Sequence, residues 1–562
     1  LRAMSSSWRG QSKSSHKLSI SISCRLFLVS LATLMLIFVT RPLLLLETFS
    51  VYNVDGRLAS SAASSWLQFI NIDLRDREKK TIKVGLVNMD DNLHVHVQVG
   101  NMNDFEAIHV GFDRVSEEIK WETLFPEWID EDRKWGGPEC PVIPIPPVDD
   151  LHDVDVVLAK LPCDHGGRNS TKGIRDVLRL QVSLVVANVA AASSRRKVYV
   201  VFLGPCPPML ELFRCDDLVS HARNQYWLYK PDLRRLEENL QTPVGSCNIA
   251  NFSTKVPEGE RVHNRRPREA YVTVLHSSEE YVCGAIALAW SIKMSNSSKD
   301  LVLLHDSAIG ATSLNGLRSA GWDTRQISPI RSPFATKGSY NEWNYSKLRI
   351  WQLTDYDKVI FIDSDVLVLR NMDKFFVYPQ LSAAPNSKTL FNSGVMVIEP
   401  SECMFKEMME KKFTLVPYNG GDQGFANEVF TWWHRLPAAL NRLKVFVDPE
   451  NANRKVADDA YSIHFLGLKP WMCYRDYDCN WDVAYHHRYA SDSAHHMFWD
   501  LYDTMPASLQ AFCGLTKHMK ERIAVWQQIA RNVSSPDGDR SSESRTPDDT
   551  AAGGEVHNID SA

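Results

Sequence analysis

The chain has 562 residues and a mass of 63.9 kDa, enough for about two to four domains of ordinary size. Its hydrophobic content of 44% supports sizeable cores, and its net charge of −5 excludes the strongly basic surface of a typical nucleic-acid-binding protein. We therefore expect a multidomain globular protein that has no nucleic-acid partner.

A basic flank precedes a single apolar segment near the start of the chain. Residues 26–39 are apolar except for one serine and one threonine, and the residues before them include lysines and arginines but no acidic residue. This order is typical of a signal anchor with a cytoplasmic N-terminus. We predict a cytoplasmic tail (1–25), a transmembrane anchor (26–46) and a luminal stem (47–75). A plastid transit peptide and a cleaved signal peptide are the alternatives.

The cysteines fit a luminal location. Ten of the eleven lie beyond Cys24, and disulfides are permitted in a secretory compartment. Cys473 and Cys479 are close enough in sequence to close a short loop. The chain has N-x-S/T sequons compatible with glycosylation, and no Cys/His cluster has the spacing of a zinc site.

The first half of the chain alternates between strand-like and helical patterns. Short apolar runs predict strands at 83–89, 154–158 and 198–203, and apolar residues recur with helical spacing within 173–192. No glycine-rich phosphate loop accompanies these strands. We predict a smaller α/β accessory domain over residues 76–265.

A second alternation follows the charged segment 258–267. The predicted strands are 270–275 and 301–304, and the predicted helices are 281–293, 313–320 and 343–353. The last helix leads into an apolar strand, 359–362. At the other end, residues 533–562 are rich in small and polar residues and are predicted to be disordered.

Two aspartates, Asp363 and Asp365, stand where the apolar strand 359–362 ends. Sheets of α/β proteins place ligand sites at such strand ends. Carboxylates there suit Mg²⁺ or Mn²⁺, and such an ion can hold a diphosphate. The bare pattern is weak, because other Asp-x-Asp pairs occur in the chain and most such pairs are solvated surface.

Four further segments accompany the acidic pair. Ser346-Lys347 precede it, and Phe391–Gly394, Asn419–Gly424 and His464–Trp471 follow it. Taken singly, each is more typical of ordinary structure, such as a packed histidine, a turn or a surface lysine. Their occurrence together in this order favours a site for a nucleotide diphosphate-sugar.

Each segment has a physical use at such a site. Asp363 and Asp365 would bind the metal with His464, and the metal would neutralise charge on the departing diphosphate. Lys469 would place an ammonium on the same phosphates, and Gly467 would let the backbone approach them closely. Asn392, Asp422 and Gln423 would offer hydrogen-bond acceptors to the sugar hydroxyls.

These segments together resemble glycosyltransferase family 8, the glycogenin-like retaining enzymes of the GT-A fold, over residues 268–520. Outside that core, the segments 121–128, 140–147, 180–188 and 473–481 resemble the plant xylan α-glucuronosyltransferases. The resemblance implies a single-pass type II Golgi membrane enzyme that uses Mn²⁺. It would transfer glucuronic acid from UDP-glucuronate to xylose residues of xylan, with other Golgi glycosyltransferases as partners.

The family pattern also implies roles for individual residues. Asp363, Asp365 and His464 would be the metal ligands. The uridine and diphosphate would contact Leu275, Tyr281, Lys347, Gly467 and Lys469. The rest of the substrate site would comprise Ser364, Asn392, Ser393, Gly394, Asp422 and Gln423. Lys347 and Asp422 are the candidates for a catalytic role.

Retention of configuration permits two routes. In double displacement Asp422 is the candidate nucleophile; in same-face attack the departing phosphate accepts the acceptor's proton. We favour same-face attack, because the sequence identifies no charged partner for Asp422. Glucuronate also calls for a cation in the sugar pocket, and Arg331, Lys337 and Arg349 lie near the right segment.

Several alternatives stand beside this interpretation. Within the family they are a glycogenin-like glucosyltransferase and another cell-wall transferase. Asn419, where glycogenins usually have an acidic residue, counts against a self-priming enzyme, as does the lack of a recognisable self-glucosylated tyrosine region. From other classes, a metal-dependent phosphohydrolase leaves the His464–Trp471 motif unexplained. An inactive carbohydrate-binding scaffold would not need to retain the metal ligands.

Overall fold

The computed structural model describes residues 66, 70, 81–89, 105–125, 140–148, 151, 153–163, 175–193, 197–222, 224–242, 247–250, 267–446 and 454–532. All of them belong to one compact unit, Ala62–Ala562. The predicted cytoplasmic tail, anchor and C-terminal tail lie outside these residues. In the predicted stem, Trp66 and Ile70 are buried against the first sheet. Within the described part, no helix is both long and apolar enough to cross a membrane.

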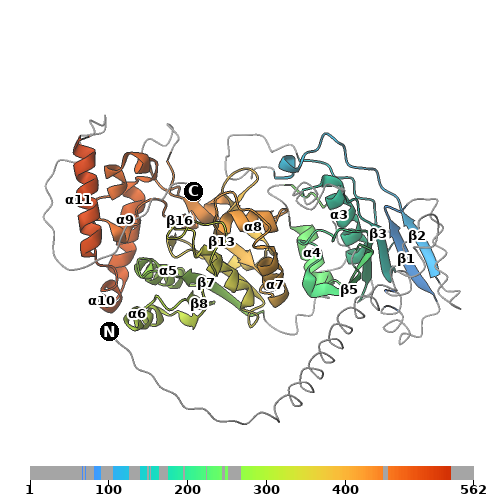
Figure 1. Cartoon of the computed structure of the whole chain (residues 1–562), viewed down its shortest axis with the longest axis horizontal. Coiled ribbons are helices and arrows are strands. Elements are labelled where there is room, and N and C mark those ends of the chain that lie inside the picture. The colour runs from blue at the N-terminus through green and yellow to red at the C-terminus, as the bar shows by residue number, and fades with distance from the viewer. Residues whose placement is uncertain are drawn as a thin grey trace, which may run out of the picture. The chain divides into compact units, whose positions relative to one another are not determined.

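The first half of the chain forms a six-stranded sheet with the order β2-β1-β3-β4-β6-β5 (Figure 1). The first four strands in this order are parallel, and β6 is antiparallel to both of its neighbours. The strands are β1 (Ile82–Val87), β2 (Phe105–Val110), β3 (Val156–Lys160), β4 (Tyr199–Leu203), β5 (Leu218–Ala222) and β6 (Tyr226–Tyr229). The strands predicted near β1, β3 and β4 are therefore present, whereas β2, β5 and β6 were not predicted.

Two helices accompany this sheet, α3 (Val177–Ala192) and α4 (Leu233–Gln241). The α3 helix begins at Val177 because the side chain of Asp176 accepts a hydrogen bond from the backbone N–H of Arg179. Almost every α3 side chain beyond the first turn is buried, which explains its nearly uniform apolar sequence.

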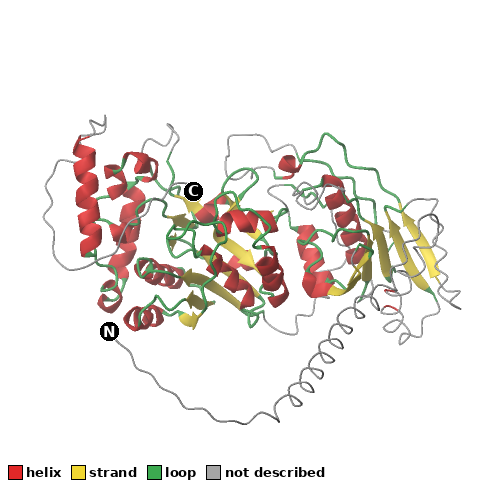
Figure 2. Ribbon diagram, in the orientation of Figure 1, coloured by secondary structure: helices red, strands yellow, loops and turns green. Residues whose placement is uncertain are grey.

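The second half forms a seven-stranded mixed sheet with the order β14-β12-β13-β10-β7-β8-β9. Strands β10, β7, β8 and β9 run parallel, and β13 is antiparallel to β10 and β12. The strands are β7 (Glu269–Leu275), β8 (Asp300–His305), β9 (Asp323–Gln326), β10 (Lys358–Ile362), β12 (Ser382–Pro385), β13 (Phe391–Ile398) and β14 (His434–Arg435). The predicted α/β class is confirmed (Figure 2).

Alternate residues of the central strands face two different cores. In β10, Ile360 and Ile362 belong to a core shared with the helices α5 (Val282–Met294), α6 (Ala311–Ala320) and α9 (Asp492–Thr504). Val359 and Phe361 belong to a core on the other face, which the helices α7 (Glu402–Lys411) and α8 (Asp422–Val429) help to form. The segment predicted as a helix at 343–353 is a 3-10 helix, Asn344–Gln352.

The core on that second face continues into the six-stranded sheet. Phe125 stacks on Trp433 with a distance of 5.5 Å between ring centroids. The carboxylate of Glu211 is buried and accepts a hydrogen bond of 2.9 Å from the backbone N–H of Trp432. The two sheets therefore share one hydrophobic core.

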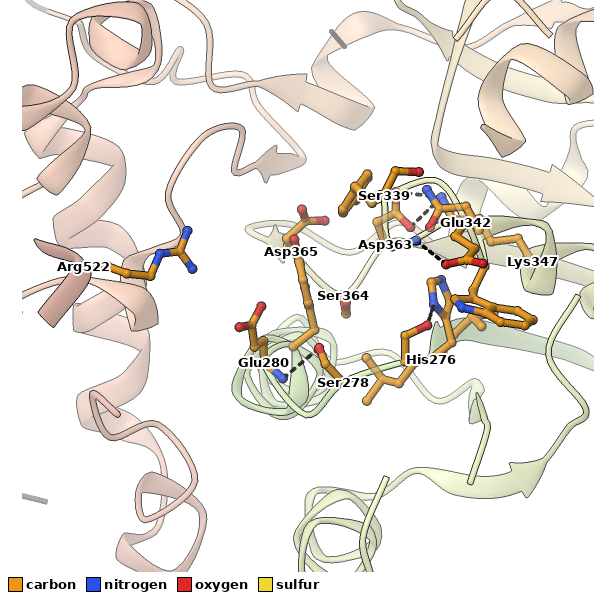
Figure 3. Close-up of a pocket in the computed structure, with 18 residues that line it drawn as sticks. His276, Ser278, Glu280, Ser339, Glu342, Lys347, Asp363, Ser364, Asp365 and Arg522 are labelled. Atoms are coloured by element: carbon orange, nitrogen blue, oxygen red, sulfur yellow. Dashed lines mark hydrogen bonds and ion pairs between the residues drawn. The ribbon is translucent and has the colours of Figure 1, made fainter. Parts of the chain in front are cut away.

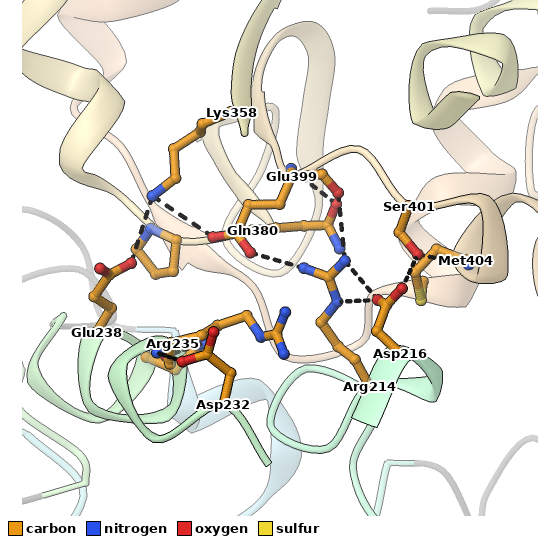
Figure 4. Close-up of polar contacts among 12 residues, drawn as sticks. Arg214, Asp216, Asp232, Arg235, Glu238, Lys358, Gln380, Glu399, Ser401 and Met404 are labelled. Atoms are coloured by element: carbon orange, nitrogen blue, oxygen red, sulfur yellow. Dashed lines mark hydrogen bonds and ion pairs between the residues drawn. The ribbon is translucent and has the colours of Figure 1, made fainter. Parts of the chain in front are cut away.

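Polar contacts join the same two regions (Figure 4). The guanidinium of Arg214, whose side chain is 6% exposed, lies 2.7 Å from Glu399 and 2.8 Å from Asp216. Asp216 also accepts a hydrogen bond of 2.6 Å from the hydroxyl of Ser401. A disulfide between Cys215 and Cys403 closes beside these contacts.

The remaining disulfides pair Cys140 with Cys247, Cys163 with Cys206, Cys283 with Cys513 and Cys473 with Cys479. The predicted short loop between Cys473 and Cys479 is confirmed. Every cysteine after Cys24 is therefore paired, which is typical of proteins of the secretory pathway. The Golgi location itself stays a prediction.

The contacts of Arg214 predict a large stability effect. Arg214→Met removes the buried guanidinium between Glu399 and Asp216 and leaves Glu399 only Lys358, at 3.6 Å, so we expect the free energy of unfolding to fall by about 3 kcal/mol. Arg234→Met is the matched control, because Arg234 is 63% exposed in its pair with Glu238 and should change stability by less than about 1 kcal/mol. Equal unfolding midpoints in urea for the two variants would contradict this account of the interface.

Candidate functional site

The predicted metal ligands come together where the seven-stranded sheet meets a third, three-stranded sheet. Asp363 and Asp365 occupy the turn between β10 and β11 (Val366–Val368), and β11 pairs antiparallel with β16 (Ser462–His464). In this register Val366 lies opposite His464. The imidazole Nε2 of His464 is 3.3 Å from Asp365 Oδ1, and ligand atoms of all three residues lie within 4.8 Å of one another. Two carboxylates and an imidazole at this separation suit a divalent cation.

A chain of hydrogen bonds fixes which nitrogen of His464 faces the carboxylates. Asn392 Oδ1 accepts from the backbone N–H of Gly394 (2.8 Å) and from Asn441 Nδ2 (2.8 Å). The other amide atom of Asn441, Oδ1, therefore faces His464 Nδ1 at 3.1 Å and accepts its proton. Neutral His464 thus presents the lone pair of Nε2 toward Asp365, as a metal ligand must.

Lys347 joins the predicted metal ligand Asp363 to the predicted catalytic residue Asp422. Its Nζ lies 2.9 Å from Asp363 Oδ1 and 2.8 Å from Asp422 Oδ2. Burial opposes the charged form of Lys347, but the two carboxylates outweigh it and raise its pKa. The expectation that Asp422 has no charged partner is therefore wrong. The sequence could not reveal this partner, because the two residues are far apart along the chain.

The sugar-side residues form a connected group around Asp422. Ser393 Oγ lies 2.9 Å from Asp422 Oδ2, and the backbone N–H of Ser393 donates to Gln423 Oε1 at 3.1 Å. Asp422 begins α8 directly after Gly421. Asn392, Ser393, Gly394, Asp422 and Gln423, all predicted from the sequence, are therefore neighbours in the structure.

Lys469 belongs to the same cluster. Its Nζ is 2.8 Å from Asp365 Oδ2, and its side chain is 10% exposed. Burial disfavours the ionised form of Asp365, but Lys469 and the other polar neighbours of this carboxylate together outweigh burial and hold the pKa of Asp365 well below its usual value. Burial raises the pKa of Asp363, and Lys347 offsets this only in part.

The loop that carries Lys469 is held by a buried polar network. Gly467 has a φ of 71°, and a Cβ there would lie 2.3 Å from Asn480 Oδ1. Asn480 bonds both the N–H and the C=O of Leu468, at 2.8 and 2.9 Å. Asn480 is positioned by Asp478, which forms a fully buried ion pair of 2.6 Å with Lys444. Glycine is therefore required at position 467 by the close approach of Asn480. Its predicted contact with a ligand stays a prediction.

A glycine in a helix brings α5 against the acidic turn. A Cβ on Gly284 would lie 2.3 Å from the carbonyl oxygen of Ser364 and 2.4 Å from the Trp471 ring. Glycine inside a helix normally costs stability, so this close approach explains its presence. No residue near position 284 in the sequence marks it as a contact.

A cavity of about 370 Å³ opens beside these residues (Figure 3). Of the predicted site residues, its lining includes Leu275, Tyr281, Lys347, Asp363, Ser364 and Asp365. Sequence reasoning missed other lining residues, among them His276, Glu280, Tyr340, Glu342 and Arg522. Burial lowers the pKa of His276 to about 4, so this imidazole is neutral at pH 7.

None of the three candidates for the cation of the sugar pocket lines this cavity. Arg331 lies 2.7 Å from Glu342 Oε1, and Arg349 donates to Gln352 Oε1 at 2.7 Å. Lys337 is exposed. Their closeness in sequence to the site was a poor guide, because none of the three side chains turns into the cavity.

Comparison with known proteins gives matches over most of the chain. A family model described as the GUX1-5 N-terminal domain matches residues 56–247, and one described as glycosyl transferase family 8 matches residues 272–380. The UDP-glucuronate:xylan alpha-glucuronosyltransferase 2 of Arabidopsis thaliana is 48% identical over 81% of this chain and 78% of its own. The UDP-glucuronate:xylan alpha-glucuronosyltransferase 1 of the same plant is 43% identical over 85% of this chain and 76% of its own.

A further Arabidopsis thaliana protein, numbered 4 in this series, is 48% identical over 93% of this chain and 96% of its own. A solved structure of the galactosyltransferase LgtC covers 43% of this chain and 99% of its own, at 17% identity and a TM-score of 0.32. The identities to the plant proteins show that the chain belongs to the UDP-glucuronate:xylan alpha-glucuronosyltransferase family, within glycosyl transferase family 8.

Proposed function

We propose that this family member is a retaining, Mn²⁺-dependent glycosyltransferase with a GT-A catalytic domain. It transfers glucuronic acid from UDP-glucuronate to xylose residues of a xylan backbone. The observation that carries the proposal is the convergence of Asp363, Asp365 and His464 beside a cavity. The relatives of the chain are named UDP-glucuronate:xylan alpha-glucuronosyltransferases.

The residues fit a divalent metal. Asp363, Asp365 and the Nε2 lone pair of His464 would hold Mn²⁺, which supplies neutralisation of the negative charge that develops on the leaving diphosphate. Lys469 lies against Asp365 and would place its ammonium beside the same diphosphate. Lys347 bridges Asp363 and Asp422, so it fixes the distance between the metal ligands and the sugar-side group.

We favour same-face attack for the transfer. In this route the acceptor hydroxyl bonds to the anomeric carbon, the bond from that carbon to the diphosphate breaks, and the departing phosphate oxygen takes the proton. Asp422 is ion-paired with Lys347 and hydrogen-bonded to Ser393, which lowers its nucleophilicity and suits it to orient the sugar.

Removal of a metal ligand should abolish metal binding. We expect Asp363→Ala and His464→Ala to weaken Mn²⁺ binding by more than about a hundredfold in calorimetric titrations, because each removes one of the protein ligands. Asp355→Ala is the matched control: Asp355 belongs to another Asp-x-Asp pair, forms ion pairs with arginines and should leave Mn²⁺ affinity unchanged. Wild-type Mn²⁺ affinity in the His464 variant would show that the imidazole is not a metal ligand.

A panel of donors tests the reaction itself. The purified chain is incubated with Mn²⁺, xylo-oligosaccharides and, in turn, UDP-glucuronate, UDP-glucose or UDP-galacturonate. We expect efficient transfer from UDP-glucuronate alone, detected as glucuronylated oligosaccharide by mass spectrometry. Faster transfer from either other donor would overturn the assigned sugar, and release of phosphate without transfer would favour the phosphohydrolase alternative.

Two variants distinguish an Asp422 that orients the sugar from an Asp422 that acts as the nucleophile. Asp422→Asn retains the shape but loses the ion pair with Lys347, so we expect kcat to fall by about ten- to a hundredfold while product configuration is retained. Complete loss of turnover in Asp422→Gly that is restored by added formate would instead identify Asp422 as the nucleophile, because glycine leaves space for the added carboxylate.

A further inference from the structure

Arg522 is the only arginine among the described residues that line the cavity. It comes from the helix α11 (Lys517–Asn532), far beyond the segment that the family 8 model matches. Figure 3 shows its side chain entering from the side opposite Lys347 and pointing toward Asp365. The sequence offered no motif at this position.

The guanidinium of Arg522 has no carboxylate partner within the described part of the chain. Its Nη1 donates to the sulfur of Met519 at 3.6 Å, and its central carbon lies 4.9 Å from the centroid of the Trp526 ring. Its Nε is buried and has no hydrogen-bond partner. A half-buried guanidinium with unused donors is costly unless a ligand accepts them.

The helix that carries Arg522 is tied to the loop that carries Lys469. Ile523 is fully buried in a cluster with Leu468 and with both cysteines of the disulfide Cys473–Cys479. Leu468 immediately precedes Lys469. Packing therefore holds Arg522 in a fixed relation to the lysine already assigned to the diphosphate.

The charges of the site leave room for another cation. Asp363, Asp365 and Asp422 carry three negative charges, and their ion-pair partners Lys347 and Lys469 carry two positive charges. A divalent ion would leave the cluster with a single positive charge. UDP-glucuronate carries about three negative charges at pH 7, one on its carboxylate and the others on its diphosphate.

We propose that Arg522 binds the diphosphate of the donor from the side opposite Lys347. The planar guanidinium presents paired N–H donors that match two phosphate oxygens. The diphosphate is favoured over the glucuronate carboxylate because Arg522 lies toward Asp365 and the Lys469 loop. The sugar-side group around Asp422 is instead reached through Lys347. The assignment rests on the proposed function, since it takes a nucleotide-sugar as the ligand.

The test measures binding without any acceptor. The full-length wild type, Arg522→Gln and Arg522→Lys are titrated with UDP, uridine, UDP-glucuronate and UDP-glucose in the presence of Mn²⁺. For Arg522→Gln we expect the Kd of all three diphosphates to rise by the same factor, about ten- to a hundredfold, with uridine affinity unchanged. Arg522→Lys should lose less. Lys517→Gln, which removes an exposed cation from the same helix, should bind UDP like the wild type.

Three results with Arg522→Gln would overturn the assignment. Unchanged UDP affinity in Arg522→Gln would show that the guanidinium does not touch the diphosphate. Equal weakening of UDP and uridine, with a lowered unfolding midpoint, would show a purely structural role. Weakening confined to UDP-glucuronate would move Arg522 to the sugar carboxylate. If the wild type binds UDP but transfers no glucuronate, the proposed function fails while this assignment stands; if it binds no UDP, both fail.

Discussion

The site depends on one strand pairing, that of β11 with β16. The turn at Asp363–Asp365 is too short to leave the acidic pair any freedom, because β10 ends at Ile362 and β11 begins at Val366. Pairing of Val366 with His464 then brings an imidazole from far along the chain to the same place. A slip of one residue would turn His464 to the opposite face of this small sheet. The backbone N–H of Phe465 donates to the carbonyl oxygen of Asp365 at 2.9 Å, and this bond extends the same register to the acidic turn.

Around that pairing, two lysines keep three acidic groups close together. Without them, the carboxylates of Asp363, Asp365 and Asp422 would repel one another in a poorly solvated space. Lys347 spans two of these carboxylates and Lys469 holds the third. Both ammonium groups lie against the carboxylates that would hold the metal, so the site is already partly neutralised before a metal and a diphosphate bind. The resting cluster is thus electrostatically close to the state with donor bound.

The sequence was informative where residue type and strand context coincide. Asp363, Asp365, His464 and Lys469 could be predicted because their segments occur together in one order along the chain, although each alone is ordinary. The structure places these four residues together. Strands β2 and β5 were missed because neither is a continuous apolar run. Positions whose role depends only on tertiary contacts gave no local signal. These are Asn441, Asn480, Gly284 and Arg522.

The shared core has a practical consequence for anyone shortening this protein. A fragment that starts at residue 267 would keep every residue of the acidic cluster, yet it would strip Phe125 from the Trp433 ring and Glu211 from Trp432. It would also lack Cys215, so Cys403 would be left as a free thiol. Such a fragment would expose an apolar patch, and we expect it to aggregate. A shortened chain that keeps this shared core intact therefore needs both sheets.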